Sequence, residues 1–206
     1  MLKLYYAPHT CALASHIALE EAGAQYETVR VSFQSDDQKK REYLAINPKA
    51  RVPSLLTDKG ILTETPALLA YIAQAYPAAK LAPADPFDFA RAQEFNSFLC
   101  STVHVAHAHR MRGTRWVDEP VAIREMQRCA PDRVAGAFAL IERDMLEGPW
   151  VMGNDYTICD PYLFTLAQWL EADGVDLGRL PRVAEHRARV AERSAVKRAI
   201  AQETAA

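Results

Sequence analysis

The 206-residue sequence lacks the features that mark membrane-spanning and nucleic-acid-binding proteins. It has no apolar run long enough to cross a bilayer, no run of basic residues, and a formal net charge of only −2. We therefore expect no membrane-spanning segment and no electrostatic surface for nucleic acid. The N-terminus also lacks a charged region followed by an apolar one, so the sequence predicts no secretory signal peptide.

Cysteine is scarce, and its four copies are widely separated, at Cys11, Cys100, Cys129 and Cys159. None of them forms a C-x-x-C pair. In a chain of this size, that distribution indicates reduced thiols rather than a disulfide framework. We therefore expect a cytoplasmic protein.

The short motifs of several enzyme classes are also absent. The sequence contains no nucleophile elbow, no phosphate-binding loop and no dinucleotide fingerprint. His104 and His107 are three residues apart and could share a helix face, but His109 points elsewhere. No cysteine or carboxylate completes this set at a usual ligand spacing, so the sequence predicts no metal site.

The first feature that is present is a strand followed by a helix, with a cysteine at their junction. Residues 2–6 are typical of a short strand, residues 7–9 break it, and Thr10 is a candidate N-cap, so Cys11 falls in the first helical turn. The N–H groups and partial positive charge of a helix N-terminus stabilise a thiolate, so we expect a lowered pKa at Cys11. A small buried residue is the alternative interpretation, and this stretch alone does not separate the two.

Apolar patterns and turn residues divide the first part of the chain into seven elements. Strands are expected over residues 2–6, 26–31, 52–56 and 61–63, and helices after Thr10, over residues 35–46 and after Thr65. The order βαβαββα predicts a thioredoxin-like domain over residues 1–76, with a four-stranded mixed sheet. Three prolines among alanines over residues 77–86 indicate an interdomain linker.

Beyond the linker, the strand signal ends and apolar residues recur at helical spacing. Residues 87–206 are therefore predicted to form an all-helical domain, which makes the expected fold class α+β followed by all-α. Within this domain, Pro131 is expected to kink one helix or to split it in two. Thr157 and Asp160 form a capping box ahead of an apolar run, which predicts that a buried helix begins there.

Four short motifs, taken together, resemble those of a known family. They are, in chain order, the phrase around Cys11, the pair Val52-Pro53, the acidic–hydroxyl pair Glu64-Thr65, and the capping box at 157–160. Their order and spacing are similar to those of glutathione transferases, and the phrase around Cys11 is similar to the opening of the bacterial, cysteine-containing beta class. The resemblance implies a cis bond before Pro53, a homodimer, and an active site in the cleft between the two domains.

The resemblance also implies glutathione as co-substrate, a tripeptide with two carboxylates, one amine and a thiol. Free N–H groups at Thr65 and the helix it starts would bind the γ-glutamyl carboxylate, and the carboxylate of Glu64 would bind the amine. The backbone of Val52 would pair with the peptide like an added strand, and the ligand thiol would point at Cys11.

The expected site residues follow from the same resemblance. The predicted catalytic residues are Cys11 and His104, with the histidine placed over the thiol. The predicted glutathione-binding residues are Tyr6, Cys11, Arg51, Val52, Pro53, Glu64, Thr65, Ser97 and Ser101, the two serines reaching the glutathione of a partner subunit. The side chains expected to shape an electrophile pocket include His107, Met111 and Trp116.

The predicted function is that of a glutathione transferase of the beta-class type. It would conjugate glutathione to hydrophobic electrophiles, exchange thiols with disulfide substrates through a mixed disulfide of Cys11, or do both. Two alternatives stay open. One is a glutathione-dependent isomerase or dehalogenase on the same fold, and the other is a non-catalytic glutathione-binding protein, because a fold does not settle a function.

Overall fold

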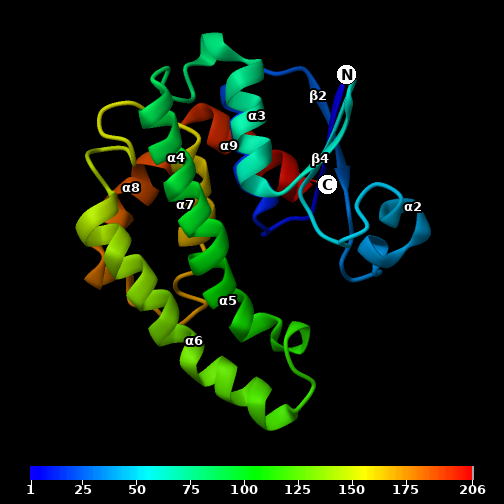
Figure 1. Cartoon of the computed structure of the whole chain (residues 1–206), viewed down its shortest axis with the longest axis vertical. Helices are drawn as coiled ribbons and strands as arrows, with labels where there is room; N and C mark the ends of the chain where they lie inside the picture. The colour runs from blue at the N-terminus through cyan, green and yellow to red at the C-terminus, as the bar shows by residue number, and fades with distance from the viewer. Residues whose placement is uncertain (206) are drawn as a thin grey trace.

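A computed structural model describes residues 1–205 of the chain. It shows a small sheet beside a group of helices that extends well beyond it (Figure 1). The first part of the chain contains, in order, β1 (Leu2–Tyr6), α1 (Ala12–Glu21), β2 (Tyr26–Arg30), α2 (Arg41–Leu44), β3 (Ser54–Thr57), β4 (Gly60–Thr63) and α3 (Thr65–Ala75). This is the predicted βαβαββα order, and the thioredoxin-like fold is confirmed.

The sheet has the strand order β2-β1-β3-β4, with β1 parallel to β2 and antiparallel to β3. A parallel pair needs a crossover, which α1 supplies, whereas β3 and β4 are joined by a tight turn. Leu4 and Leu55 are partners in register, and both are fully buried. Every residue from Ala12 to Leu19 is buried, because α1 packs against both α7 and α9 of the helical part.

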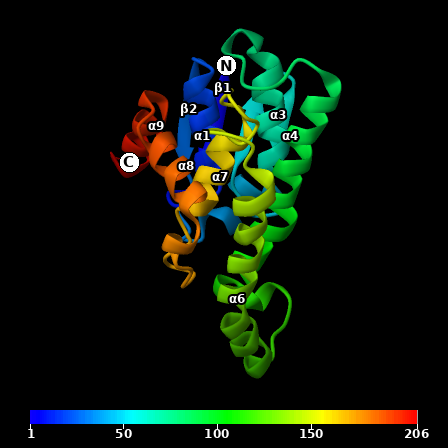
Figure 2. The same cartoon turned by 90° about the vertical axis from the view of Figure 1, so that its left-hand side faces the viewer.

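The described residues beyond α3 contain helices and no strand. The helices are α4 (Pro86–Phe98), α5 (His104–Met111), α6 (Pro120–Leu140), α7 (Cys159–Ala167), α8 (Pro181–Ala191) and α9 (Ser194–Ala205), with π-helical stretches at Leu99–Val103 and Ile141–Met145. α7 packs against both α1 and α8. In Figure 2, α6 runs down into the long arm of the molecule. This arrangement confirms the helical second part.

Pro131 does not split its helix, so that part of the prediction is wrong. α6 continues without a break from Pro120 to Leu140. Proline removes one N–H from a helix interior, but the neighbouring Ala130 and Val134 are buried. Packing of this face therefore outweighs the local cost of the proline.

The hydrogen bonds of the predicted capping box form, and a buried helix begins there, although the N-cap residue of α7 is Ile158, one residue later than predicted. The Asp160 carboxylate is fully buried and accepts hydrogen bonds from the Thr157 N–H (2.7 Å), the Thr157 hydroxyl (3.3 Å) and the Val151 N–H (2.8 Å). Its Oδ1 also lies 2.9 Å from Nε2 of His186 in α8. One carboxylate thus joins the start of α7 to a loop and to a neighbouring helix.

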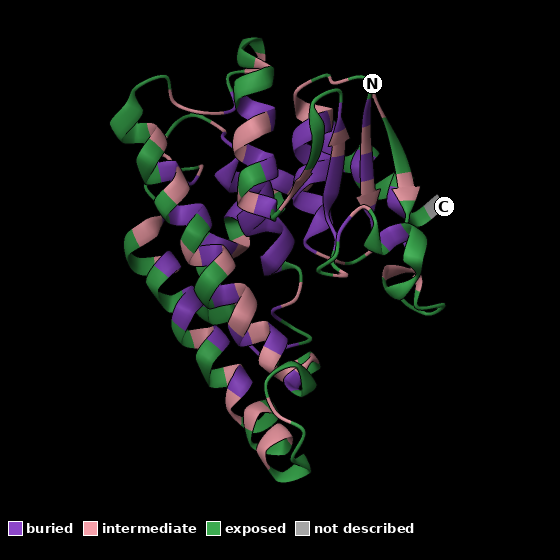
Figure 3. Cartoon of the chain, turned by 45° about the vertical axis from the view of Figure 1, so that its right-hand side comes forward, coloured by how far each residue is buried: buried purple, intermediate pink, exposed green. Residues whose placement is uncertain are grey.

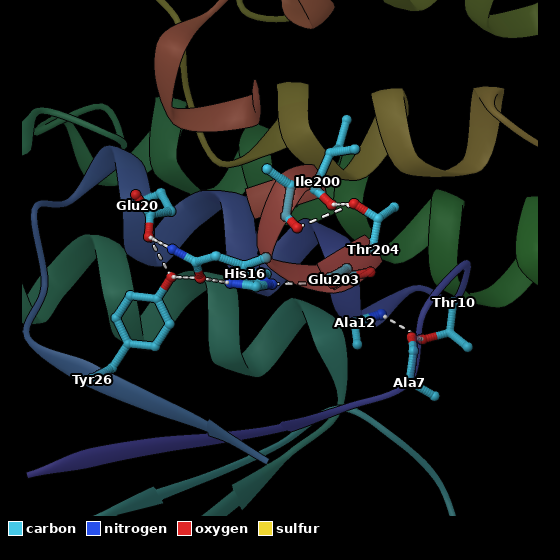
Figure 4. Close-up of polar contacts among 11 residues, drawn as sticks. Ala7, Thr10, Ala12, His16, Glu20, Tyr26, Ile200, Glu203 and Thr204 are labelled. Atoms are coloured by element: carbon cyan, nitrogen blue, oxygen red, sulfur yellow. Dashed lines mark hydrogen bonds and ion pairs between the residues drawn. The ribbon is translucent and has the colours of Figure 1, made fainter. Parts of the chain in front are cut away.

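Side-chain contacts join the C-terminal helix, α9, to the first helix, α1. Nδ1 of the fully buried His16 lies 3.1 Å from Oε1 of Glu203, and its Nε2 lies 2.8 Å from Oε1 of Gln202 (Figure 4). Buried side chains of both parts form one continuous cluster. Figure 3 colours the buried residues of both parts purple. The domain boundaries at residues 76 and 87 remain a proposal, although α3 ends at Ala75 and α4 begins at Pro86.

None of the helices within residues 1–205 is both long enough and apolar enough to cross a membrane.

Candidate active site between the sheet and the helices

A cleft lies between the sheet part and the helical part. Its first wall comes from residues that precede α3 or begin it: His9, Thr10, Cys11, Phe33, Asn47, Ala50, Arg51, Val52, Pro53, Glu64 and Thr65. Its second wall comes from the helical part: Cys100, His104, Val105, His107, Ala108, Arg112, Arg115, Trp116, Tyr162 and Trp169. Most of the residues predicted from the sequence motifs therefore meet in one place.

Cys11 sits at the N-cap position of α1, one residue before the helix begins. The Thr10 hydroxyl shapes this turn, because it donates to the Ala7 carbonyl (2.7 Å) and accepts from the Ala12 N–H (3.3 Å; Figure 4). The Cys11 thiol donates to the carbonyl oxygen of Val52 at 3.6 Å. The thiol and the backbone before Pro53, which are 41 residues apart in the chain, are therefore in contact.

The prediction that the pKa of Cys11 is lowered is wrong for this structure. Burial of the side chain raises the pKa of the Cys11 thiol, and this effect is larger than those that oppose it. The opposing groups are the Thr65 hydroxyl, which hydrogen-bonds the sulfur, and the positive charge of Arg112. The position at a helix N-terminus does not outweigh the removal of the thiol from water.

The loop before β3 is held by hydrogen bonds to one carbonyl. The Tyr43 hydroxyl and the Asn47 side-chain amide each donate to the Arg51 carbonyl oxygen at 2.7 Å. The peptide bond between Val52 and Pro53 is cis, as the resemblance implied. Because its carbonyl is held inside the protein, Arg51 is fixed at the backbone while its side chain is exposed on the cleft.

The start of α3 differs by one residue from the prediction. Glu64, not Thr65, is the N-cap residue, and Thr65 is the first residue of the helix. No side chain caps the first N–H groups of α3, so they stay available to an anion. Glu64 has a φ of 76°, a value that L-residues rarely adopt, and its carboxylate lies 2.5 Å from the Lys49 ammonium.

His104 lines the cleft, but it does not supply the positive charge that was expected. Burial, together with the nearby charges of His107 and Arg112, lowers the pKa of His104 to about 4. The ring is therefore neutral at pH 7, and it packs at 5.3 Å from the Trp169 ring. The cation that stabilises the Cys11 thiolate is Arg112.

Three predicted glutathione-binding residues do not line the cleft. Tyr6 is in the core with 1% of its surface exposed, because the alternation of β1 points it at α1, where its ring lies 5.6 Å from His16. Ser97 and Ser101 are exposed on the helical part, outside the cleft of their own chain. Their proposed contact with a partner subunit's glutathione stays a prediction.

The second wall contains groups that the sequence motifs did not reveal. Nδ1 of His107 lies 2.7 Å from the buried carboxylate of Asp173, to which Arg110 Nε also donates at 2.7 Å. The His107 ring stacks on Trp169, with centroids 4.3 Å apart. This contact fixes an aromatic surface in the cleft, and no local motif marks its members because Asp173 is 66 residues from His107.

Lys49, Arg112 and Arg115 were also missed as cationic groups of the site. Of the three side chains expected in an electrophile pocket, His107 and Trp116 line the cleft, whereas Met111 is exposed and does not. Within residues 1–205, no cluster of three histidine, cysteine or acidic side chains is arranged to hold a metal ion.

Comparison with known proteins agrees with this geometry. The family model described as the glutathione S-transferase N-terminal domain matches residues 1–74. Glutathione S-transferase GstA of Escherichia coli O157:H7 is 32% identical over 98% of this chain and 98% of its own. A glutathione transferase homologue from Sulfitobacter, solved with bound glutathione, is 42% identical, covers 98% of both chains and superposes with a TM-score of 0.95.

A bacterial beta-class glutathione S-transferase from Sphingomonas chungbukensis is also similar in structure, with 31% identity, a TM-score of 0.85 and coverage of 98% of both chains. The matches extend over both the sheet part and the helical part, not over the first domain alone. The resemblance inferred from the motifs is thereby confirmed, and the chain belongs to the glutathione S-transferase family of enzymes, close to its bacterial beta class.

Proposed function

We propose that the cleft binds glutathione and that Cys11 is its reactive residue. One observation carries this proposal: the Cys11 thiol, the Val52 carbonyl and the uncapped start of α3 face the same cleft. These groups match a ligand with a thiol, a peptide backbone and a carboxylate. The glutathione-bound Sulfitobacter relative supports the same ligand.

The charges of the first wall match the two ends of glutathione. The γ-glutamyl carboxylate binds the free N–H groups at the start of α3 and the Thr65 hydroxyl. The γ-glutamyl amine binds Glu64, whose carboxylate is half-exposed and already adjacent to a cation, Lys49. The glycyl carboxylate binds Arg51, and the peptide pairs with the Val52 backbone.

Two reactions are open to this arrangement. In conjugation, the glutathione sulfur forms a bond to an electrophilic carbon, the leaving group departs with the bonding electrons, and the thiol proton goes to solvent. In exchange, the Cys11 thiolate attacks a disulfide, a new S–S bond forms, the old one breaks, and the released thiolate takes up the proton. Thr65 and Arg112 favour the thiolate form that exchange needs.

Calorimetry with reduced glutathione, an assay with 1-chloro-2,4-dinitrobenzene, and mass measurement after incubation with oxidised glutathione test the proposal. The expected results are binding, formation of the dinitrophenyl conjugate, and one glutathione adduct that maps to Cys11. Absence of both binding and adduct would contradict it. Binding without either reaction would favour the non-catalytic alternative.

An isomerase on the same fold is not better supported. A relative named maleylacetoacetate isomerase, from Pseudomonas aeruginosa, is 28% identical over 88% of this chain, which is below the identity with GstA. We also propose a cytoplasmic homodimer. All four cysteines are free in the described part of the chain, which suits a reducing compartment, and Ser97 and Ser101 would face the partner's cleft.

A further inference from the structure

The outer end of the second wall has a chemistry that the proposed function does not use. α5 ends at Met111, Arg112 follows it, and the next turn, Gly113–Arg115, leads directly to Trp116 (Figure 1). Arg112, Arg115 and Trp116 all line the cleft. Two cations and an aromatic ring are therefore presented together, from one short segment.

Arg112 is half-buried and Arg115 is exposed, and neither has an acidic partner like those of the other half-buried arginines of the helical part. Arg110 is paired with Asp173, Arg187 with Glu171, and Arg193 with Glu21. In contrast, no carboxylate within residues 1–205 lies within ion-pair distance of the Arg112 or Arg115 side chain. The acidic side chain of the first wall, Glu64, is already paired with Lys49. The cleft therefore carries uncompensated positive charge.

The arginines are also close to one another and to the reactive sulfur. Burial, followed by the charges of Arg112 and Arg51, lowers the pKa of the Arg115 guanidinium. Arg112 in turn acts on the Cys11 thiol. Like charges this close repel, and a bound anion relieves that repulsion. The anion would lie in the same cleft as the Cys11 sulfur, at which the glutathione thiol is expected to point.

We propose that Arg112 and Arg115 bind a carboxylate of the electrophilic substrate, which makes that substrate an aromatic carboxylic acid. This inference rests on the proposed function, in which the start of α3 and Arg51 already bind the two carboxylates of glutathione. Guanidinium groups bind carboxylates through paired N–H donors. The ring of the acid packs against Trp116 and Trp169, both of which line the cleft.

The reaction on such a substrate balances without any further reagent. With 4-chloro-3-nitrobenzoate, the glutathione sulfur forms a bond to the ring carbon that carries chlorine. The C–Cl bond breaks, chloride leaves with the electron pair, and the thiol proton goes to solvent. The carboxylate does not react, so it serves only to hold the ring.

A binding experiment tests the inference without turnover. 3-Nitrobenzoate and 3-nitrobenzamide have nearly the same shape and differ in charge, and neither carries a leaving group. Each is titrated into the glutathione-saturated protein, and quenching of tryptophan fluorescence gives its Kd. We expect the acid to bind about tenfold more tightly or better, as charge-assisted hydrogen bonds allow.

The double variant Arg112→Gln with Arg115→Gln should bind acid and amide equally, while Arg124→Gln should keep the wild-type preference. Arg124 is a matched control because it is exposed on α6 and does not line the cleft. Equal binding of acid and amide by the wild type would overturn the inference. A double variant that keeps the preference, or that loses glutathione affinity instead, would also overturn it.

Activity separates this inference from the proposed function. Rates with 4-chloro-3-nitrobenzoate and with its amide are each divided by the uncatalysed rate with glutathione at the same pH. If the acid and the amide are conjugated with equal rate enhancements, the proposed function is supported and the carboxylate site is contradicted. Failure to bind glutathione, with the acid still preferred when the titration is repeated on the protein without glutathione, would contradict the proposed function and leave the carboxylate site.

Discussion

The two walls of the cleft are built on different principles. The first wall offers backbone groups and short polar side chains: the Val52 carbonyl, the N–H groups at the start of α3, and the Thr65 hydroxyl. The second wall offers long or aromatic side chains, such as Arg112 and Trp169, that come from separate helices and turns. The backbone groups of the first wall suit a ligand of one fixed shape, whereas substitution of side chains alone can change which ligand the second wall binds.

This difference between the walls indicates which residues determine substrate specificity. The Arg51 carbonyl of the first wall is held by neighbours a few residues away, Tyr43 and Asn47, although the Cys11 thiol contacts Val52 across 41 residues. Groups of the second wall depend on long-range contacts, such as the one between His107 and Asp173. Substitutions in the two walls should therefore change different properties.

The largest expected effect comes from the reactive thiol of the first wall. Cys11→Ala should abolish the adduct with oxidised glutathione and all thiol–disulfide exchange, because the attacking sulfur is gone. Cys100→Ala is the control, since Cys100 lines the same cleft from the second wall. Mass measurement with peptide mapping checks both variants. An adduct that persists in Cys11→Ala, or that maps to Cys100 in the wild type, would show that Cys11 is not the nucleophile.

The next effect concerns how the second wall is held in place. Asp160→Asn should lower the free energy of unfolding by about 3 kcal/mol, because a buried carboxylate that accepts hydrogen bonds from Val151, Thr157 and His186 loses its charge. Asp155→Asn, at an exposed position, should change it by less than about 0.5 kcal/mol. Urea denaturation measures both. Equal stability of the two variants would mean that the capping box does not hold α7.

A third substitution separates ligand binding from stability on the first wall. Glu64→Gln should weaken glutathione binding by about 10- to 100-fold, because the ligand amine loses its counter-charge. Stability should change by less than about 1 kcal/mol, since the Glu64–Lys49 pair is exposed. Calorimetry and thermal melting measure the two quantities, with Glu42→Gln on the exposed surface of α2 as control. If Glu64→Gln binds glutathione with wild-type affinity, Glu64 does not bind the ligand amine.

The smallest expected effect compares two side chains of the second wall. Arg112→Gln should raise the pKa of Cys11, which moves the labelling profile to higher pH and slows labelling at pH 7 by about threefold. His104→Asn should leave the profile between pH 6 and 9 unchanged, because the pKa of His104 is about 4 and no charge is lost in that range. Rates of reaction with a thiol reagent, measured against pH, check both. If His104→Asn shifts the labelling profile and Arg112→Gln does not, the partner of the Cys11 thiol is His104 and not Arg112.

Much of the fold could be predicted because its signals are local. The short strand at residues 2–6, the two strands on either side of residues 58–59, and the capping box at Thr157 and Asp160 each depend on signals over a few residues, and each appears in the structure. The errors in the helices were local as well. Thr65 is one residue past the N-cap, and Pro131 stays inside a continuous helix, because buried neighbours outweigh a local preference.

The sequence by itself determined the order of elements, the family, and the first wall of the cleft, because those depend on short motifs. The tertiary structure decided the rest. It placed Tyr6 in the core, removed Cys11 from water so that its pKa rises, and kept His104 neutral. It also brought Arg112 and Arg115 to the same cleft as the thiol. Burial and charge depend on what surrounds a group in space, and such neighbours can be far apart in the chain, as Arg112 is about a hundred residues from Cys11.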